Sequence, residues 1–318
     1  MWRPSASIET LKQRATYIAQ IRQFFIGRGV LEVETPCLSH YSVTDPFVVG
    51  IPAIFQAIGS QHQAICYLQT SPEYAMKRLL AANAGPIYQL SKSFRQGEVG
   101  RIHNPEFTLL EWYRPQYDHH ALMDEMDDLL QLILQVGPAQ RVTYAEVYMN
   151  KLGVNPHTAT IDTLADIARA RCGLSFDSLD KDGWLDILWT HLIEPMVGLN
   201  VPLFVYDFPA SQASLAKVRP GNPALASRFE VYFKGTELAN GFHELQNAQE
   251  QIARFDKNNA YRQAQGLPMI PIDKHLISAL EHGLPESAGV ALGVDRLIML
   301  ALGKTNIADI LSFDFERA

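Results

Sequence analysis

The sequence predicts an α+β fold in which antiparallel strand pairs lie together and helices flank them. The first observation is a pair of apolar runs at 87–95 and 106–113, separated by the glycine-bearing loop 96–105, which is typical of a hairpin. The second is another such pair at 228–233 and 236–245, turned at Lys234 and Gly235. Because the strands do not alternate regularly with crossover helices, a Rossmann or TIM-barrel fold is disfavoured.

The first third of the chain predicts two helices. An apolar stripe with helical spacing covers 7–28, and Gly27 and Gly29 end it. An extended stretch at 30–34 follows and runs into Pro36. The run Thr70-Ser71-Pro72-Glu73 predicts a helix start with a Thr-x-x-Glu capping box, and the helix would extend from Glu73 to about Ala82.

The remaining elements complete the expected layout. Residues 120–135 have amphipathic helical spacing, and 137–200 have a helical pattern with Pro and Gly breaks, which we interpret as an insertion within a single catalytic domain spanning 1–318. A strand is expected at 203–208 and a polar, exposed helix at 248–265. The apolar, glycine-interrupted run 289–296 predicts a strand that leads into a helix at 295–302.

Composition limits the function classes. The chain has 318 residues, of which 47% are apolar, and a formal net charge of −7, so it is expected to be globular and to lack a broad nucleic-acid-binding face. Cys37, Cys66 and Cys172 are far apart and form no CxxC pair, so a disulfide framework and a zinc site are disfavoured. With no apolar signal region after Met1, we expect a cytoplasmic protein.

Three segments carry residues suited to phosphate chemistry. Arg95, at a strand end beside a flexible loop, suits phosphate because a guanidinium matches phosphate geometry. Glu230 and Glu237 lie on facing strands of a tight hairpin, where two carboxylates repel each other unless a cation such as Mg²⁺ lies between them. In Gly293-Val-Asp-Arg296 the glycine permits close backbone approach and the arginine can reach a ligand.

In this order the segments resemble the three motifs of class II aminoacyl-tRNA synthetases, within nearly the whole chain. Gly29 to Pro36 resembles motif 1, Phe94-Arg95 through Phe107 resembles motif 2, and Gly289 to Arg296 resembles motif 3. The runs HNPEFTLLEWY and ELANGFHEL are most similar to lysyl-tRNA synthetases. The resemblance implies an antiparallel sheet flanked by helices, a homodimer, and the use of ATP and Mg²⁺.

The resemblance also implies roles in nucleotide binding. Arg95 would hold the α-phosphate and stabilise the transition state, while Arg296 would stack on the adenine opposite Phe107. Glu230 and Glu237 would hold Mg²⁺. The other residues expected beside the nucleotide are Gly97, Glu98, His103, Asn104, Glu237, Leu238 and Gly293.

The pattern of side chains also predicts an amino-acid pocket. Glu111 and Tyr113 share one strand face by the period-2 rule, and Asn240, Phe242 and Glu244 share another. If those faces meet, the cavity selects an ammonium group and rejects a carboxylate side chain, because an unpaired buried charge costs about 3–5 kcal/mol. Glu73 would take the substrate's other amino group. The residues expected to bind the amino acid are Ser71, Pro72, Glu73, Glu111, Tyr113, Asn240, Phe242, Glu244 and Ala291.

Two positions depart from the family pattern. Motif 2 has Glu two residues after the arginine, whereas this chain has Gly97 there and Glu98 one further on, so either Glu98 or the loop backbone takes over the adenine contact. Ala291 stands where lysyl-tRNA synthetases usually have Gly. We hypothesise that its methyl group favours β-lysine over α-lysine.

The position of motif 1 suggests the acceptor. Lysyl-tRNA synthetases carry an anticodon-binding barrel of roughly a hundred residues before motif 1, but here motif 1 begins near residue 27, so we expect no such barrel and no anticodon recognition. A core of this kind resembles the bacterial ligases that modify elongation factor P, a tRNA mimic. The resemblance implies activation of (R)-β-lysine or L-lysine as an aminoacyl-adenylate and its transfer to a lysine side chain of that factor.

Three alternatives remain open at this point. The chain could be a stand-alone lysyl-tRNA synthetase-like enzyme that charges tRNA, although its negative charge weighs against this. It could be a non-catalytic lysine-sensing paralogue, which the intact Arg95, Glu237 and Arg296 disfavour. It could also resemble ammonia-dependent asparagine synthetase, whose carboxylate substrate Glu111 and Glu244 should repel.

Overall fold

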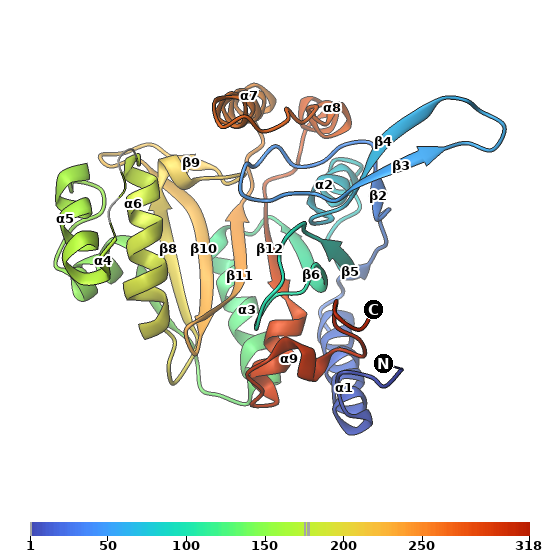
Figure 1. Cartoon of the computed structure of the whole chain (residues 1–318), viewed down its shortest axis with the longest axis horizontal. Coiled ribbons are helices and arrows are strands. Elements are labelled where there is room, and N and C mark those ends of the chain that lie inside the picture. The colour runs from blue at the N-terminus through green and yellow to red at the C-terminus, as the bar shows by residue number, and fades with distance from the viewer. Residues whose placement is uncertain (1, 175, 177–178) are drawn as a thin grey trace. The chain divides into compact units, whose positions relative to one another are not determined.

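The computed structural model describes residues 2–174, 176 and 179–318 (Figure 1). The chain separates into two compact units. Unit 1 comprises Met1–Gln116 and Gln246–Ala318, and unit 2 comprises Tyr117–Leu245. Each unit contains strands and helices of its own, and antiparallel pairing dominates in both. The α+β prediction is therefore confirmed.

In unit 1, four of the strands are paired in the order β1-β5-β6-β12. The β1–β5 pair is parallel, and the β5–β6 and β6–β12 pairs are antiparallel. A separate three-stranded sheet has the order β2-β4-β3. The strands of unit 1 are β1 (Leu31–Glu32), β2 (Leu38–Ser39), β3 (Pro52–Gln56), β4 (Gln63–Leu68), β5 (Ile87–Phe94), β6 (Glu106–Pro115) and β12 (Ser287–Gly293).

The register of β5, β6 and β12 gives this part of the sheet two distinct faces. Glu111 of β6 lies opposite Gln89 of β5 and Ala291 of β12, so these three side chains belong to one face. The other face is apolar: Phe25 of α1 (Ile8–Ile26) stacks on Tyr88 with ring centroids 4.5 Å apart and meets Trp112 edge-on. One face is thus sealed by a helix, while the face that carries Glu111 is polar.

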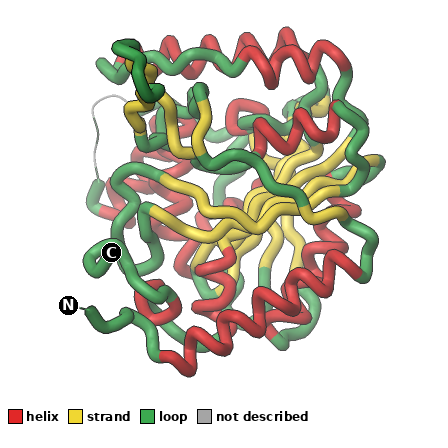
Figure 2. The backbone as a smooth tube through the Cα atoms, turned by 90° about the vertical axis from the view of Figure 1, so that its right-hand side faces the viewer, coloured by secondary structure: helices red, strands yellow, loops and turns green. Residues whose placement is uncertain are grey.

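Five helices and a short 3₁₀ turn accompany the strands of unit 1. They are α1 (Ile8–Ile26), α2 (Glu73–Ala81), α7 (Ala248–Ala264), α8 (Lys274–His282), α9 (Val294–Ala301) and η4 (Ile307–Ile310). The two chain ends lie close together (Figure 2), because Ser5 and Ala6 donate backbone hydrogen bonds to Ser312 and Leu311.

Unit 2 contains strands in the order β11-β10-β8-β7, with β9 paired to β10. They are β7 (Gln140–Thr143), β8 (Leu203–Pro209), β9 (Val218–Arg219), β10 (Leu225–Phe233) and β11 (Thr236–His243). The helices are α3 (His119–Leu134), α4 (Tyr144–Leu152), α5 (Ile161–Cys172), α6 (Lys181–Leu188), the π-helical turn η1 (Trp189–Ile193) and the 3₁₀ turns η2 (Glu194–Met196) and η3 (Ala210–Gln212).

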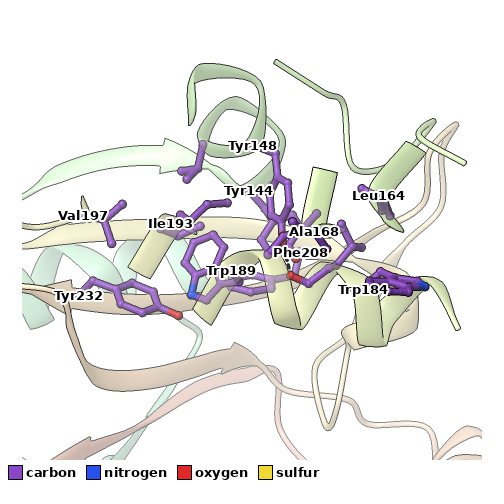
Figure 3. Packing of buried hydrophobic residues seen from close by; sticks show 14 of the residues in the cluster. Tyr144, Tyr148, Leu164, Ala168, Trp184, Trp189, Ile193, Val197, Phe208 and Tyr232 are labelled. Atoms are coloured by element: carbon purple, nitrogen blue, oxygen red, sulfur yellow. Dashed lines mark hydrogen bonds between the residues drawn. The ribbon is translucent and has the colours of Figure 1, made fainter. Parts of the chain in front are cut away.

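An aromatic core holds the helices of unit 2 to its strands (Figure 3). Trp189 stacks on Tyr144 with ring centroids 5.4 Å apart and also contacts Tyr232 of β10. The buried phenol of Tyr148 donates to the backbone oxygen of Leu185 at 2.6 Å, so its polar atom is satisfied within the core. Burial of these large rings fixes β10, the strand that carries Glu230.

Most predicted elements are confirmed, including both hairpins, the helices at 7–28, 120–135 and 248–265, and the strand-to-helix passage at 289–302. The capping box was wrong: Pro72 is the N-cap of α2 with no side-chain cap, and the hydroxyl of Ser71 accepts from the backbone N–H of Glu73 at 3.1 Å. Proline lacks a capping side chain, so the preceding serine satisfies this first-turn N–H instead.

The segment 137–200 lies in unit 2 and is mostly helical, but it also contributes strand β7, which the sequence pattern missed. Residues 175, 177 and 178 of this segment lie outside the described residues. A single catalytic domain with an insertion here stays a prediction. Cys37, Cys66 and Cys172 are free thiols. Within the described ranges, none of the helices has the length and apolar character needed to cross a membrane.

Candidate active site

Arg95 lies at the start of the loop between β5 and β6, directly after the last paired residues of the hairpin. The backbone N–H of Arg95 donates to the oxygen of Pro105 at 2.9 Å, which closes the loop directly after the last strand pair. Within the loop Gly97 has φ +81°, a left-handed conformation that glycine adopts without steric cost. Gly97 is thus required for the turn, which explains physically why a glycine stands where motif 2 usually has Glu.

Arg95 is held by an aromatic ring and a carboxylate. Its guanidinium carbon lies 5.1 Å from the ring centroid of Phe107, and Nη1 lies 3.6 Å from Oε1 of Glu98. Its Nε is buried and has no hydrogen-bond partner among the described residues. This donor is suited to an incoming anion, since a buried N–H without an acceptor is unfavourable.

Arg296 and His103, which the sequence analysis expects beside the nucleotide, contact each other. Nη2 of Arg296, in the first turn of α9, lies 2.6 Å from Nε2 of His103, and Nε donates to the oxygen of Ile102 at 3.3 Å. Burial, and then the charge of Arg296, lower the pKa of His103 below its ordinary value. The ring is therefore neutral at pH 7 and accepts a hydrogen bond from the guanidinium.

Asn104 is tied to the end of the chain. Its Nδ2 donates to the backbone oxygen of Glu106 at 2.6 Å, and its Oδ1 accepts from the backbone N–H of Phe315 at 2.9 Å. An expected nucleotide contact through this amide stays a prediction, and it would have to share or replace one of these bonds. Because the two residues are 211 positions apart, this contact was not detectable from local pattern.

A second polar cluster in unit 1 is organised around the buried carboxylate of Glu111. The hydroxyl of Ser71 donates to Oε2 at 2.7 Å, and the phenol of Tyr113 donates to Oε1 at 2.5 Å. Glu111 is only 2% exposed. The prediction that Glu111 and Tyr113 share one strand face is confirmed, and Ser71 joins them from the turn before α2. These bonds fix the carboxylate in one orientation, which is what selective binding of an ammonium group requires.

Glu73 has a partner that the sequence analysis missed. Lys77, one turn later on α2, donates to Oε1 of Glu73 at 2.6 Å, and the lysine side chain is 2% exposed. The i,i+4 spacing was the available signal. A role for Glu73 in binding the substrate's other amino group stays a prediction, and that group would join a carboxylate that already has a cation.

Strand β12 brings small residues beside Glu111. Ala291 lies opposite Glu111 and Gly293 lies opposite Leu109, so each leaves room above β6. Asp295 has a different task, because it is 2% exposed and accepts from the backbone N–H of Thr108 at 2.7 Å. It also pairs with Arg14 at 2.7 Å. Asp295 therefore holds α9 and α1 against β6, and this fixes the position of Arg296.

In unit 2 a buried arginine organises the predicted residues of the β10–β11 hairpin. Arg228 donates to Oε1 of Glu230, to Oδ1 of Asn240 at 3.2 Å and to the oxygen of Gln212 at 2.6 Å. The phenol of Tyr232 donates to the other oxygen of Glu230. Arg228 and Tyr232 were not predicted as site residues. The signal was their alternation with Glu230 on one strand, since residues i, i+2 and i+4 share a face.

A bulge decides which way Glu237 faces. Val231 pairs with Ala239, but the next residue, Tyr232, pairs with Glu237. Leu238 is therefore an extra residue in β11, and the side chain of Glu237 lies on the same strand face as that of Asn240. Burial, and then the charges of Glu230 and Glu237, raise the pKa of Tyr232 well above its ordinary value. The negative charges of both carboxylates therefore raise the pKa of the same phenol, that of Tyr232.

The carboxylates of this hairpin are candidate ligands for a divalent cation. No group of three or more His, Cys, Asp or Glu side chains suited to a metal occurs within the described residues. Glu230 and Glu237 nevertheless supply two carboxylates. Arg228 supplies one positive charge close to them, so one net negative charge is left. The hard oxygen donors and the excess of negative charge are what Mg²⁺ binding needs. Mg²⁺ itself stays a prediction.

The remaining predicted residues of unit 2 are buried on or beside β11. Leu238, Phe242 and Glu244 are 2%, 8% and 1% exposed. Glu244 forms an isolated bridge with Ala216. The predicted residues are therefore divided between the two units. In unit 1 they are Ser71, Pro72, Glu73, Arg95, Gly97, Glu98, His103, Asn104, Phe107, Glu111, Tyr113, Ala291, Gly293 and Arg296, and in unit 2 they are Glu230, Glu237, Leu238, Asn240, Phe242 and Glu244.

The chain is similar to known proteins along essentially its whole length. A family described as "tRNA synthetases class II (D, K and N)" matches residues 1–317. The chain is 57% identical over 320 residues to an elongation factor P–(R)-β-lysine ligase of Vibrio vulnificus strain YJ016, covering 100% of this chain and 99% of the relative. It is 52% identical over 320 residues to the protein of the same name in Pseudoalteromonas translucida strain TAC 125, with the same coverage.

Proposed function

The chain belongs to the class II tRNA synthetases of the D, K and N type, and on that premise we propose that it is a ligase that modifies elongation factor P. It would activate (R)-β-lysine, or L-lysine, with ATP and transfer it to a lysine side chain of that factor. The observation that carries the proposal is a sequence identity of 50–57% over essentially the full length of relatives that are named for this reaction. The buried Glu111, oriented by two hydroxyl groups, is consistent with an amino-acid substrate that carries an extra ammonium group.

The first step forms an aminoacyl-adenylate. A carboxylate oxygen of the amino acid attacks the α-phosphorus of ATP, and pyrophosphate leaves. Arg95 would hold the α-phosphate through donors that include its buried Nε, and Arg296, oriented by the neutral ring of His103, would bind the triphosphate and adenine. Fixed positive charges of this kind stabilise the transition state without reorganisation.

Mg²⁺ fits the same proposal. Glu230 and Glu237 would hold it, with Arg228 and Tyr232 orienting Glu230. When bound, the ion would neutralise charge on phosphate oxygens. The protein's own contribution is to keep the two carboxylates on one face of the β10–β11 hairpin, which the bulge at Leu238 achieves.

The second step forms an amide bond. The ε-amine of the acceptor lysine loses its proton, attacks the carbonyl carbon of the adenylate and expels AMP. Its reference pKa is about 10.4, so a base is needed, and the adenylate phosphate is a candidate for that role. Selection of the amino acid would rest on Glu111 of β6, and the roles expected of Asn240, Phe242 and Glu244 stay predictions.

The proposal also covers the cellular location and the oligomeric state of the enzyme. We propose a cytoplasmic location, because the proposed acceptor takes part in translation. A homodimer is proposed from the resemblance of Gly29–Pro36 to motif 1. Recognition through an anticodon is not part of the proposal, because the relatives named for a protein acceptor match over 98–99% of their own lengths.

The decisive test is a modification assay read by intact-protein mass. The protein is incubated with ATP, Mg²⁺, elongation factor P and either (R)-β-lysine or L-lysine. We expect a mass increase of one lysyl residue on the factor that depends on ATP and on the amino acid. Charging of purified tRNA at a comparable rate, or no gain of mass with either isomer, would contradict the proposal.

Matched variants connect the assay to the site. Glu111→Gln keeps the shape of the side chain but removes its charge, so adenylate formation should fall at least tenfold while ATP still binds. Glu106→Gln, on the exposed end of the same strand, is the control and should keep full activity, because this side chain is 53% exposed. Arg296→Ala should weaken ATP binding itself. Unchanged exchange activity in Glu111→Gln would show that the pocket is assigned to the wrong residue.

A further inference from the structure

One buried polar side chain on the face of Glu111 has a free acceptor atom. Gln89 of β5 is 2% exposed, and its Oε1 has no hydrogen-bond partner among the described residues. Buried carbonyl oxygens in folded proteins nearly always accept a hydrogen bond. Each such exception needs an explanation, and a donor on a bound ligand is one that the position of the atom can support.

The strand register shows where this atom belongs. Gln89 lies directly opposite Glu111 in the antiparallel β5–β6 pair, and residues opposite each other in such a pair project from the same face. That face is the one on which Ser71 and Tyr113 orient the carboxylate of Glu111. The amide of Gln89 therefore belongs to the wall of the amino-acid pocket, which the sequence motifs did not indicate.

Gln89 begins a row of polar groups along β5. Ser91 and Ser93 follow at two-residue steps on the same face, and the hydroxyl oxygen of each is buried without a partner among the described residues. Ser93 lies opposite Phe107, the ring that contacts Arg95, so the row extends from the Glu111 end of the face to the nucleotide end. Convergent polar groups along one face of a pocket are typical of a ligand-binding wall.

We propose that Gln89 is a specificity-determining residue whose side-chain oxygen accepts a hydrogen bond from the ammonium group that Glu111 binds. This inference deepens the proposed function and rests on it. A diamino acid supplies a cationic N–H at that position, whereas an amino acid with an apolar or carboxylate side chain leaves the amide oxygen unsatisfied or faces it with another acceptor. Gln89 would thus add to the discrimination in favour of lysine isomers without adding a second negative charge beside Glu111.

The test is Gln89→Met, which keeps the length of the side chain and removes the acceptor. In pyrophosphate exchange we expect KM for (R)-β-lysine to rise about tenfold to a hundredfold, the range for a hydrogen bond to a charged group, while KM for ATP stays within about twofold. The melting temperature of the protein without substrate should not fall, because the lost oxygen had no partner in the folded chain.

A control separates binding from folding. Gln69→Met removes an amide whose Nε2 donates to the backbone oxygen of Lys92 at 2.8 Å, so its melting temperature should fall. If Gln89→Met loses melting temperature to the same extent as Gln69→Met and leaves KM for the amino acid unchanged, the residue is structural and the inference is wrong. If instead the unmodified protein shows no pyrophosphate exchange with either lysine isomer, the proposed function itself is wrong. This result is distinct from a failure of the inference about Gln89, in which the unmodified protein is active.

Discussion

Removal of Arg228 is the perturbation whose size the structure defines best. Its guanidinium donates to Glu230 and Asn240 and lies 4.5 Å from the ring centroid of Phe208. The side chains of Arg228 and Glu230 are 17% and 10% exposed, so the pair is mostly shielded from water. Removing one partner of a buried pair costs about 3–5 kcal/mol because the other charge is left without compensation. We expect Arg228→Met to lose about this much unfolding free energy.

A double-mutant cycle isolates the interaction. Glu230→Gln should destabilise the unmodified protein, but in the Arg228→Met background it should be neutral or stabilising, because it removes the uncompensated charge. The coupling free energy is then about 2 kcal/mol or more. The assay is urea denaturation followed by circular dichroism, with the four proteins at one pH and one salt concentration.

An exposed pair in the same unit provides the control. Arg169 and Asp166 lie 2.7 Å apart on α5, but their side chains are 59% and 72% exposed, so their cycle should give about 0.5 kcal/mol or less. Additive effects within about 0.5 kcal/mol at Arg228 and Glu230 would refute the reasoning. The same result would remove the physical argument that Arg228 positions Glu230 for a cation.

The other predictions concern selectivity, pH and the chain end. Ala291 lies opposite Glu111, so Ala291→Gly should shift the exchange preference from (R)-β-lysine toward L-lysine, and an unchanged ratio of kcat/KM values would contradict the hypothesis. The lowered pKa of His103 means that its contribution to stability is complete above about pH 6.5 and is lost as pH falls through the folded-state pKa. His103→Gln should therefore make the unfolding free energy less dependent on pH below about pH 6.5, and an unaltered pH profile would count against this reasoning. Deleting residues 312–318 frees Asn104 from Phe315, which should change KM for ATP severalfold and leave KM for the amino acid unaltered; equal changes in both would argue for general unfolding.

Local pattern was sufficient for most of the fold. The two hairpins follow from apolar runs separated by glycine-bearing turns, and the face shared by Glu111 and Tyr113 follows from the two-residue period of a strand. The Glu73–Lys77 pair is equally local, because residues four apart on a helix are neighbours, so the sequence pattern contained the signal for it. The capping box failed because Thr-x-x-Glu is also compatible with a proline N-cap, where Ser71 instead satisfies the first-turn N–H.

The sequence by itself determined which residue types are available for binding phosphate and ammonium groups, since those depend on motif spacing along the chain. Only the tertiary structure decided how they are used. The bulge at Leu238 turns Glu237 toward the face of Asn240, the distant Phe315 binds Asn104, and strand register places the unsatisfied oxygen of Gln89 opposite Glu111. Each of these depends on which atoms from separate segments meet and which polar atoms remain unsatisfied, and periodicity along a chain carries no information about either.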